Sequence, residues 1–593
     1  MNELKKRDEI ELKYKWKLED IIADENHINK VFDSCREKLK KIQEYKGKLN
    51  KENTIECLVL TDLLSVDLEK IFVYTHMKRD ENTADSKYIE LSEKVRLLSV
   101  EVSGATSFIV PELSRFKTKD LKEMQNSPRY KDYDIEIKYT LRNKKHLLSD
   151  REEKLLSDIT LFSSGYKNVF QVFDNADLKF EDIEVDGEKV QVTHGMYSFL
   201  LQNPSQQVRR AAFESIYTQY KAYTNTLAAN YSGNVNKNVF YARARKYSSS
   251  LEGALYSDAI DEKVYDNLIE AVRQNTALVH RYVGLRKRVL ALEEYHMYDM
   301  YAPIVKDTSE KQDYDLSYDT IVEALSVLGD DYVKQLKIAR ENRWIDVEET
   351  QNKRSGAYSW GAYGVHPYVL LNHKGTMHDV FTISHEMGHA LHSHYSNTAQ
   401  PYSKAGYGIF LAEIASTVNE VLLLKYMLRT AKGEKRKYLL SYYLDMFRTT
   451  LFRQTMFAEF EKFAHASVEE GQPLSSDKLS EFYYELNKKY YGDEVIHDDY
   501  IKYEWSRIPH FYNAFYVYKY ATGLTAAINI VRKILKKEEG FVDKYIEFLK
   551  SGGSDYPLKI LEKTGINLKG KRPYMVAMNE FEKTLLALER MCK

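Results

Sequence analysis

Residues 376–395 read TMHDVFTISHEMGHALHSHY, and this stretch carries the pattern that decides the fold. Thr376 is followed three residues later by Asp379, an arrangement typical of a capping box at the start of a helix. Apolar residues then recur three and four positions apart, at Ile383, Met387, Ala390 and Leu391. The stretch therefore predicts a helix that begins after Thr376 and runs to about Tyr395.

This predicted helix carries an HExxH motif. His385 and His389 are four residues apart, so their imidazoles project from one helix face and can share a single metal ion. Glu386 follows the first histidine and can reach a water on that ion without binding the ion itself. Two neutral nitrogen ligands, a general base and an open coordination position together indicate a hydrolytic zinc site.

A zinc site needs a third protein ligand, and the spacing leaves two acids open. The metzincin pattern is excluded because His392 and Tyr395 occupy the positions where it requires glycine and histidine. His392 lies about one turn further along the helix, which favours a core or surface role over metal binding. Glu413 and Glu420 are seven residues apart on a second predicted helix, from Ile409 to Thr430, and either could be the ligand.

The rest of the chain reads as mostly helical, with only 10 Pro and 25 Gly in 593 residues. Helical patterns extend from Leu18 to Phe170 and from Pro204 to Leu292, and further helices are predicted over Tyr438–Lys462 and Leu524–Leu549. A hairpin is predicted at Lys179–Val192, with Asp186-Gly187 as a type I′ turn.

A strand is predicted ahead of the metal-binding helix, at Val365–Asn372. Pro367 favours an edge or near-edge position for it, because proline cannot donate a hydrogen bond to a neighbouring strand. An edge strand beside the metal could bind an extended peptide through its main chain. Gly361 and Gly364 would let another backbone come close.

Composition argues against several other classes of protein. Charged residues cancel to a net charge of -1, so neither nucleic acid nor an anionic membrane is expected as a partner. No run of 18 apolar residues predicts a membrane span. The three cysteines, Cys35, Cys57 and Cys592, form no metal-binding spacing, and with the charged N-terminus they favour a cytoplasmic protein.

Several motifs together resemble the oligoendopeptidase F family, the bacterial branch of the thimet-oligopeptidase-like zinc peptidases. They are HEMGH, the AEIAST that contains Glu413, and the late HFYNAFYVYKYATG. The early Trp16-Lys17-Leu18-Glu19-Asp20 and the KRSGAY at 353–358 extend the resemblance over nearly the whole chain. The resemblance implies one Zn²⁺ ion bound by His385, His389 and Glu413, with Glu420 oriented towards a ligand histidine.

The resemblance also implies a fold and an activity. The expected fold is a mainly α, zincin-type metallopeptidase with a small β-sheet beside the HExxH helix. Residues 1–195 would form an N-terminal helical cap over a deep substrate channel, and residues 196–593 would form the catalytic domain. The expected enzyme is a zinc endopeptidase of short unfolded peptides, with Glu386 as general base on a zinc-bound water; the oligomeric state is left open.

A second group of candidate catalytic residues lies late in the chain. Related enzymes place a histidine and tyrosines in this region as donors to the transition state, which implies such a role for His510, Tyr512 and Tyr516. In a helix Tyr512 and Tyr516 would share a face that Tyr520 extends; packing against the core is the competing interpretation.

Two other functions remain open. A carboxypeptidase or dipeptidyl carboxypeptidase of the same architecture would need a cation to hold the substrate carboxylate, for which Arg507 is available. A zinc-dependent peptide-binding protein without turnover would not need Glu386, so the presence of this residue argues for catalysis.

Overall fold

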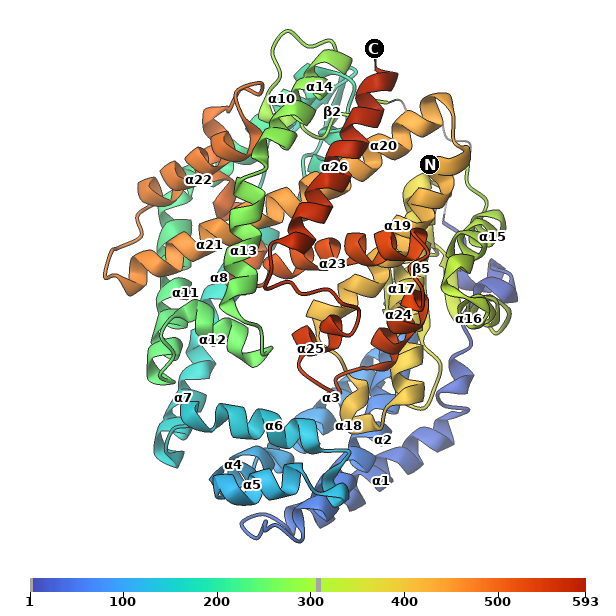
Figure 1. The fold of residues 1–593 in the computed structure, drawn as a ribbon, viewed down its shortest axis with the longest axis vertical. Helices are drawn as coiled ribbons and strands as arrows, with labels where there is room; N and C mark the ends of the chain where they lie inside the picture. Colours follow the sequence, from blue (N-terminus) through green and yellow to red (C-terminus); the bar gives the residue numbers. More distant parts are fainter. Residues whose placement is uncertain (1–3, 306–310, 593) are drawn as a thin grey trace. The chain divides into compact units, whose positions relative to one another are not determined.

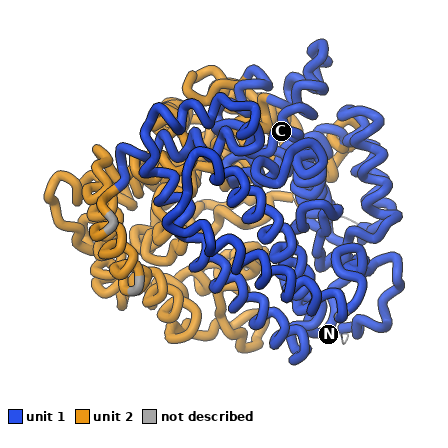
Figure 2. The backbone as a smooth tube through the Cα atoms, turned by 90° about the horizontal axis from the view of Figure 1, so that it is seen from below, with its two compact units in different colours: residues 1–147, 309–426, 530–565 blue, residues 148–308, 427–529, 566–593 orange. Residues whose placement is uncertain are grey.

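The computed structural model describes residues 4–305 and 311–592, and it is mainly helical with two small sheets. This confirms the predicted fold class. The chain forms two compact units, coloured separately in Figure 2. The first unit contains residues 1–147, 309–426 and 530–565, and the second contains 148–308, 427–529 and 566–593. Both units are thus assembled from segments far apart in the sequence.

The first unit carries the metal-binding helix, α17, and a three-stranded sheet (Figure 1). Its described helices and strands are α1 Glu25–Gln43, α2 Thr54–Glu81, α3 Ser86–Thr106, α4 Ile109–Arg115, α5 Thr118–Gln125, α6 Asp134–Asn143, α15 Tyr314–Ala324, α16 Asp330–Glu341, β3 Ile345–Glu348, β4 Tyr358–Trp360, β5 Tyr368–His373, α17 Met377–Ala399, α18 Tyr402–Ala405, α19 Ile409–Thr430, α24 Phe541–Lys550 and α25 Pro557–Glu562.

The sheet of the first unit has the order β3-β5-β4, with β5 parallel to β3 and antiparallel to β4. The strand ahead of the predicted metal-binding helix, expected at the edge of the sheet or next to it, is therefore the central strand, with an edge strand on each side. Strand β5 begins at Tyr368, after Pro367, so the proline does not interrupt its hydrogen bonds and β5 can occupy the centre. The edge strands are β3 and β4, and the sequence pattern did not reveal β4 because it is only three residues long.

Gly361 and Gly364 were expected to let another backbone come close, but in the structure they serve the fold of the chain itself. A Cβ atom on Gly361 would lie 3.1 Å from the Cα atom of Pro367, so the backbone that approaches this glycine belongs to the chain itself. Gly364 has a φ of +81°, a left-handed conformation that glycine adopts without strain. Both glycines thus form the turn that returns the chain from β4 to β5.

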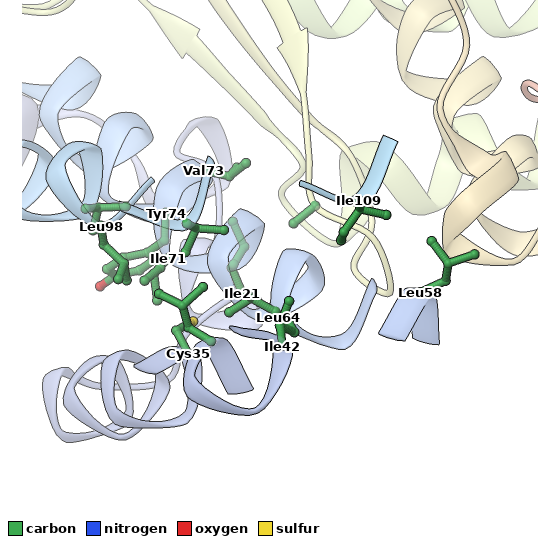
Figure 3. Packing of buried hydrophobic residues seen from close by; sticks show 14 of the residues in the cluster. Ile21, Cys35, Ile42, Leu58, Leu64, Ile71, Val73, Tyr74, Leu98 and Ile109 are labelled. Carbon is green, nitrogen blue, oxygen red and sulfur yellow. The ribbon is translucent and has the colours of Figure 1, made fainter. Parts of the chain in front are cut away.

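The two faces of β5 contact different neighbours. Tyr368 and Leu370 belong to a large apolar cluster with Trp16 and residues of the N-terminal helices. Figure 3 shows part of this cluster, including Ile42 and Leu64. The alternating residues Val369 and Leu371 face the other side, where α17 packs on the sheet.

Buried ion pairs fix the chain that leads into β4. Lys353 Nζ lies 2.7 Å from Asp346 Oδ1 on β3, and Arg7 Nη2 lies 2.7 Å from Oδ2 of the same aspartate. The next residue, Arg354, pairs with Asp80 on α2 at 3.1 Å. The KRSGAY motif therefore anchors the edge strand to the sheet and to the N-terminal helices.

The second unit is built mostly of helices, with one hairpin (Figure 1). Its described helices and strands are α7 Asp150–Ser163, α8 Gly165–Val172, β1 Ile183–Val185, β2 Glu188–Val190, α9 His194–Leu200, α10 Gln206–Ala222, α11 Thr224–Ala244, α12 Ser250–Ser257, α13 Glu262–Arg273, α14 Thr276–Val289, α20 Gly433–Met446, α21 Arg453–Glu469, α22 Ser476–Tyr491, α23 Tyr518–Leu535 and α26 Arg572–Met591; the last turns of α23 belong to the first unit. The predicted hairpin is confirmed, with positive φ at both Asp186 and Gly187.

The prediction of one helix face shared by Tyr512, Tyr516 and Tyr520 is wrong. A short 3-10 helix ends at Tyr512, and α23 begins only at Tyr518. Between them Phe515 has a φ of +54°, and its N–H donates to Glu461 on α21 at 2.9 Å. This buried side-chain acceptor replaces the helical hydrogen bond that sequence periodicity alone would suggest.

None of the helices within the described ranges combines the length and the apolar character needed to cross a bilayer.

Candidate metal centre

Helix α17 begins where the sequence predicts, at Met377, and Thr376 forms the expected capping box with Asp379. The Thr376 hydroxyl accepts from the Asp379 N–H at 3.2 Å, and the Asp379 carboxylate accepts from the Thr376 N–H at 2.8 Å. These bonds fix the start of the helix, and therefore the rotation that turns His385 and His389 towards α19.

Three side chains of the first unit converge beside α17. Glu413 Oε2 on α19 lies 3.7 Å from His385 Nε2 and 3.9 Å from His389 Nε2. Each residue offers one ligand atom, and the three atoms lie within 4.8 Å of one another. Two imidazole nitrogens and one carboxylate oxygen match the donors that a catalytic divalent metal takes, with a position left for water. These residues therefore fit a metal ion.

Glu420 acts on the other nitrogen of His385. Its Oε2 atom lies 3.0 Å from His385 Nδ1, which leaves Nε2 directed at Glu413. Burial lowers the pKa of His385, but the hydrogen bond and charge of Glu420, with the charges of Glu386 and Glu413, outweigh it and raise this pKa to about 9. A cation at Nε2 is therefore favoured, and a metal ion satisfies the same electrostatic demand as a proton.

His389 differs from His385 in its second ring nitrogen. Among the described contacts, no acid bonds to His389 Nδ1. Burial lowers the pKa of His389 to about 3, and the neighbouring His385 and His392 add to the effect. The imidazole is thus neutral near pH 7, the form in which histidine binds a metal. His392 itself is a core residue, as expected: it is 1% exposed and stacks on Tyr407, with ring centroids 3.7 Å apart.

Helices α17 and α19 approach closely at Gly388. A Cβ atom there would lie 2.6 Å from the Cα atom of Ser416 and 2.8 Å from the Ala415 carbonyl oxygen. Asn419 adds a polar link, since its Nδ2 donates to the Ser384 carbonyl at 3.2 Å. This close packing of the two helices brings Glu413 within reach of both histidines.

Glu386 lies on the same helix, 8% exposed, beside the edge strand. Its carboxyl accepts a hydrogen bond from the backbone N–H of Ser359 on β4. Burial, together with Glu413 and Glu420, raises the pKa of Glu386 to about 7 against the opposing charge of His385. Such a carboxyl can take up and return a proton near neutral pH. Ser359 was missed by sequence reasoning because a backbone donor leaves no side-chain signal.

The second candidate group lies in the second unit. The rings of His510 and Tyr516 stack with centroids 6.1 Å apart, and the Tyr520 hydroxyl lies 3.4 Å from His510 Nε2. Tyr512 is separate: its hydroxyl accepts from Asn230 Nδ2 at 3.0 Å, and its ring stacks on Phe170 at 4.5 Å. The structure thus groups His510 with Tyr516 and Tyr520, and places Tyr512 in the packing of α8 and α11.

Arg507 is already engaged. Its guanidinium lies over the ring of Tyr197 at 5.2 Å and within 3.7 Å of Glu504, and its side chain is 19% exposed. Glu504 also pairs with Arg453 at 2.8 Å, so it is the burial of Arg507, more than neutralisation, that makes this residue poorly suited to hold a substrate carboxylate.

A helical fold in which HExxH and a glutamate on a following helix form a metal site defines a metallopeptidase, and the family comparison agrees. The sequence model of peptidase family M3 matches residues 199–580, and the chain belongs to this family. A second family model, oligopeptidase F, matches residues 112–180. The predictions of the family and of a peptide-cleaving enzyme are confirmed.

Named relatives resemble the chain over its whole length. Oligopeptidase PepF of Bacillus subtilis is 41% identical over 100% of this chain and 89% of its own. Oligoendopeptidase F, chromosomal, of Lactococcus lactis subsp. cremoris is 38% identical over 99% of both chains. The crystal structure of oligoendopeptidase-F from Enterococcus faecium has a TM-score of 0.75 and 34% identity, covering 95% of this chain and 99% of that one.

Proposed function

We propose that this metallopeptidase is a zinc-dependent endopeptidase that cleaves internal bonds of short unfolded peptides. The observation that carries the proposal is the convergence of His385, His389 and Glu413 beside Glu386, whose carboxyl is held by a strand backbone. The names of the relatives, oligopeptidase and oligoendopeptidase, support the substrate class.

We assign one Zn²⁺ ion to His385, His389 and Glu413. When bound, zinc supplies a Lewis acid that polarises the peptide carbonyl and lowers the pKa of water. Glu420 holds the His385 ring through Nδ1, so that Nε2 presents its lone pair to the ion. Ser416 bonds to Glu413 Oε2 at 3.3 Å and restrains the third ligand.

Glu386 is the proposed general base. Its carboxylate accepts a proton from the attacking water, holds it in the buried site, and transfers it to the leaving amine as the peptide bond breaks. The Ser359 N–H orients the carboxylate during both transfers. His510, Tyr512 and Tyr516 retain their proposed role as donors to the carbonyl oxygen as it gains negative charge, and the position of Tyr520 beside His510 supports adding it to this group.

The outer edge of β4 provides a main-chain template for the substrate. Val369 donates its N–H to Trp344, on the β3 side of the sheet. Its partner on β4 is Ser359, so the backbone groups of Ser359 point away from β5. The N–H serves Glu386, and the carbonyl remains to accept from a peptide. An extended peptide can therefore pair with this edge beside Glu386, almost independently of its sequence. We also propose that residues 1–195 form a cap over a channel, and that this cap limits the size of the substrate.

Blocked peptides test this function against its rivals. The full chain is incubated with a nine-residue peptide, acetylated and amidated, after chelation and after addition of one equivalent of Zn²⁺, and products are identified by mass spectrometry. Internal cleavage that depends on zinc is expected. If only a free C-terminus permits cleavage, the enzyme is a carboxypeptidase; zinc binding without any cleavage would leave a peptide-binding protein.

A further inference from the structure

A pocket of about 270 Å³ opens in the first unit beside the turns of α17 that precede His385. Its walls come from the first two turns of α17, the end of β5 and the chain entering β4. The residues that matter for its shape are Ala357, Leu371, His378, Thr382 and Ile383. Because all of them belong to one compact unit, the pocket is defined without reference to the second unit.

The pocket continues the helix face that carries the metal ligands. His378, Thr382, His385 and His389 are spaced four, three and four residues apart, so they form one stripe along α17. Thr382 precedes His385 by about 4.5 Å along the helix axis. An extended peptide advances about 3.3 Å per residue, so the pocket lies about one substrate residue from the metal ligands.

The direction of β4 decides which substrate residue reaches the pocket. Strand β4 runs from the pocket, where Ala357 precedes it, past Ser359 and Glu386. Antiparallel pairing is the more stable arrangement per residue, and a peptide paired in this way runs in the opposite direction along β4. The residue that follows the cleaved bond therefore lies on the side of Ala357 and the pocket.

The chemistry of the walls favours an uncharged side chain. Leu371 and Ile383 form an apolar floor and are 2% and 1% exposed. Two charged groups of the rim have partners already: Lys374 Nζ lies 3.2 Å from Glu349, and the Asp379 carboxylate accepts from the N–H groups of Lys374 and Thr376. Asn372 Oδ1 and His373 Nδ1 add to the lining two buried, uncharged polar atoms without a hydrogen-bond partner among the described residues. The volume exceeds the roughly 150 Å³ of an apolar cavity that binds benzene, so a leucine or phenylalanine side chain fits.

We propose that this pocket binds the substrate side chain immediately after the cleaved bond and selects apolar residues up to the size of phenylalanine. The proposal rests on the peptidase function above. It adds a side-chain preference to substrate binding that otherwise depends only on main-chain hydrogen bonds to β4.

Kinetics with a matched peptide series test the pocket. The zinc-loaded full chain is given blocked peptides that differ only in the residue after the cleaved bond (Ala, Leu, Phe, Asp or Lys), with the cleavage position verified by mass spectrometry. For the wild type, kcat/KM for Leu and Phe should exceed that for Asp and Lys at least tenfold. Thr382→Phe should lower the ratio of kcat/KM for Phe to that for Ala at least tenfold, because the new ring occupies the pocket.

The same helix offers a matched control. Thr398, like Thr382, bonds through its hydroxyl to the carbonyl four residues earlier, at 2.7 Å and 3.1 Å respectively. Thr398→Phe adds the same bulk on an exposed position near the end of α17 and should keep the wild-type ratio. Ala357→Leu narrows the pocket from the β4 side and should reproduce the effect of Thr382→Phe if that variant fails to fold.

The outcomes separate the pocket from the peptidase function. An unchanged Phe-to-Ala ratio in zinc-replete Thr382→Phe and Ala357→Leu would overturn the pocket proposal, as would a shift in preference before the cleaved bond instead of after it. Failure of the zinc-loaded wild type to cleave any peptide would contradict the proposed peptidase function itself.

Discussion

Gly388 lies so close to Ser416 that a Cβ atom on the glycine would stand 2.6 Å from the serine Cα atom. The contact joins the helix that carries both proposed histidine ligands to the helix that carries Glu413, the proposed third ligand. One turn of α19 separates Ser416 from Glu413, so any increase in the distance between these helices moves the third ligand. The metal centre therefore depends on a backbone contact as well as on its ligands.

Gly388→Ala should weaken metal binding and destabilise the protein. The added methyl group forces α17 and α19 apart, and overpacking of this kind costs about 1–3 kcal/mol. We expect a lower Tm in thermal unfolding and at least a tenfold rise in the Kd for zinc, measured by competition with a chelator.

Gly104→Ala is the matched control for this substitution. Gly104 lies in α3, and a methyl group added there would have no neighbouring atom within 4 Å, so the change should stabilise the protein by about 0.5–1 kcal/mol through helix propensity alone. Wild-type zinc affinity and Tm in Gly388→Ala would show that the helices can separate without cost.

Glu413 and Glu420 should differ in their effects on zinc. Glu413→Ala removes a proposed ligand and should abolish binding at micromolar zinc. Glu420→Ala removes only the bond to His385 Nδ1 and should weaken binding about 10–100-fold. Isothermal titration measures both, with Glu341→Ala, at an exposed position of α16, as control. A larger loss for Glu420→Ala than for Glu413→Ala would exchange the two roles.

Glu386→Gln should separate metal binding from catalysis. The amide oxygen can still accept from the Ser359 N–H, but the side chain can no longer carry a proton. We expect one zinc per chain by elemental analysis and a fall in kcat of about 10²–10⁴-fold on a blocked peptide. Turnover above a tenth of the wild-type value would exclude Glu386 as the general base.

Glu461→Gln should change how stability depends on pH. Burial raises the pKa of Glu461 to about 8, although the hydrogen bond from the Phe515 N–H opposes this shift. Between pH 4.5 and 8 the unfolded chain releases this proton while the folded chain keeps it, so folding stability falls as pH rises, by about 1.4 kcal/mol per pH unit.

Glutamine does not titrate, so the variant should lose the part of the pH dependence of stability that Glu461 causes. Differential scanning calorimetry at pH 5, 6, 7 and 8 should give a Tm difference, variant minus wild type, that grows with pH. The comparison cancels contributions that both proteins share, including that of zinc. Parallel Tm curves would show that Glu461 is ionised in the folded protein.

Local signals were enough for the elements around the metal. Capping by Thr376 and Asp379, and the spacing of Ile383, Met387 and Leu391, predicted α17 because helix starts and helix faces are set by neighbours in the chain. The hairpin turn at Asp186-Gly187 was predictable for the same reason, since its left-handed conformations depend on those two residues.

Elements fixed by distant partners were not predictable in this way. The order β3-β5-β4 depends on which strands pair, and a three-residue edge strand has no periodicity to read. Likewise, the break between Tyr512 and Tyr518 depends on the Glu461 carboxyl, which accepts the Phe515 N–H from 54 residues away. Periodicity suggested a continuous helix because it contains no information about such a partner.

The sequence by itself determined the chemistry of this protein: an HExxH helix, two downstream acids on one face, and a family pattern that assigned them. The choice between Glu413 and Glu420 could not be made from spacing, because residues seven apart on a helix point the same way. The tertiary structure placed Glu413 beside both Nε2 atoms and Glu420 at His385 Nδ1, and it set Glu386 against the edge strand. Those relations arise where α19 and β4 pack on α17, so only the folded chain could decide them.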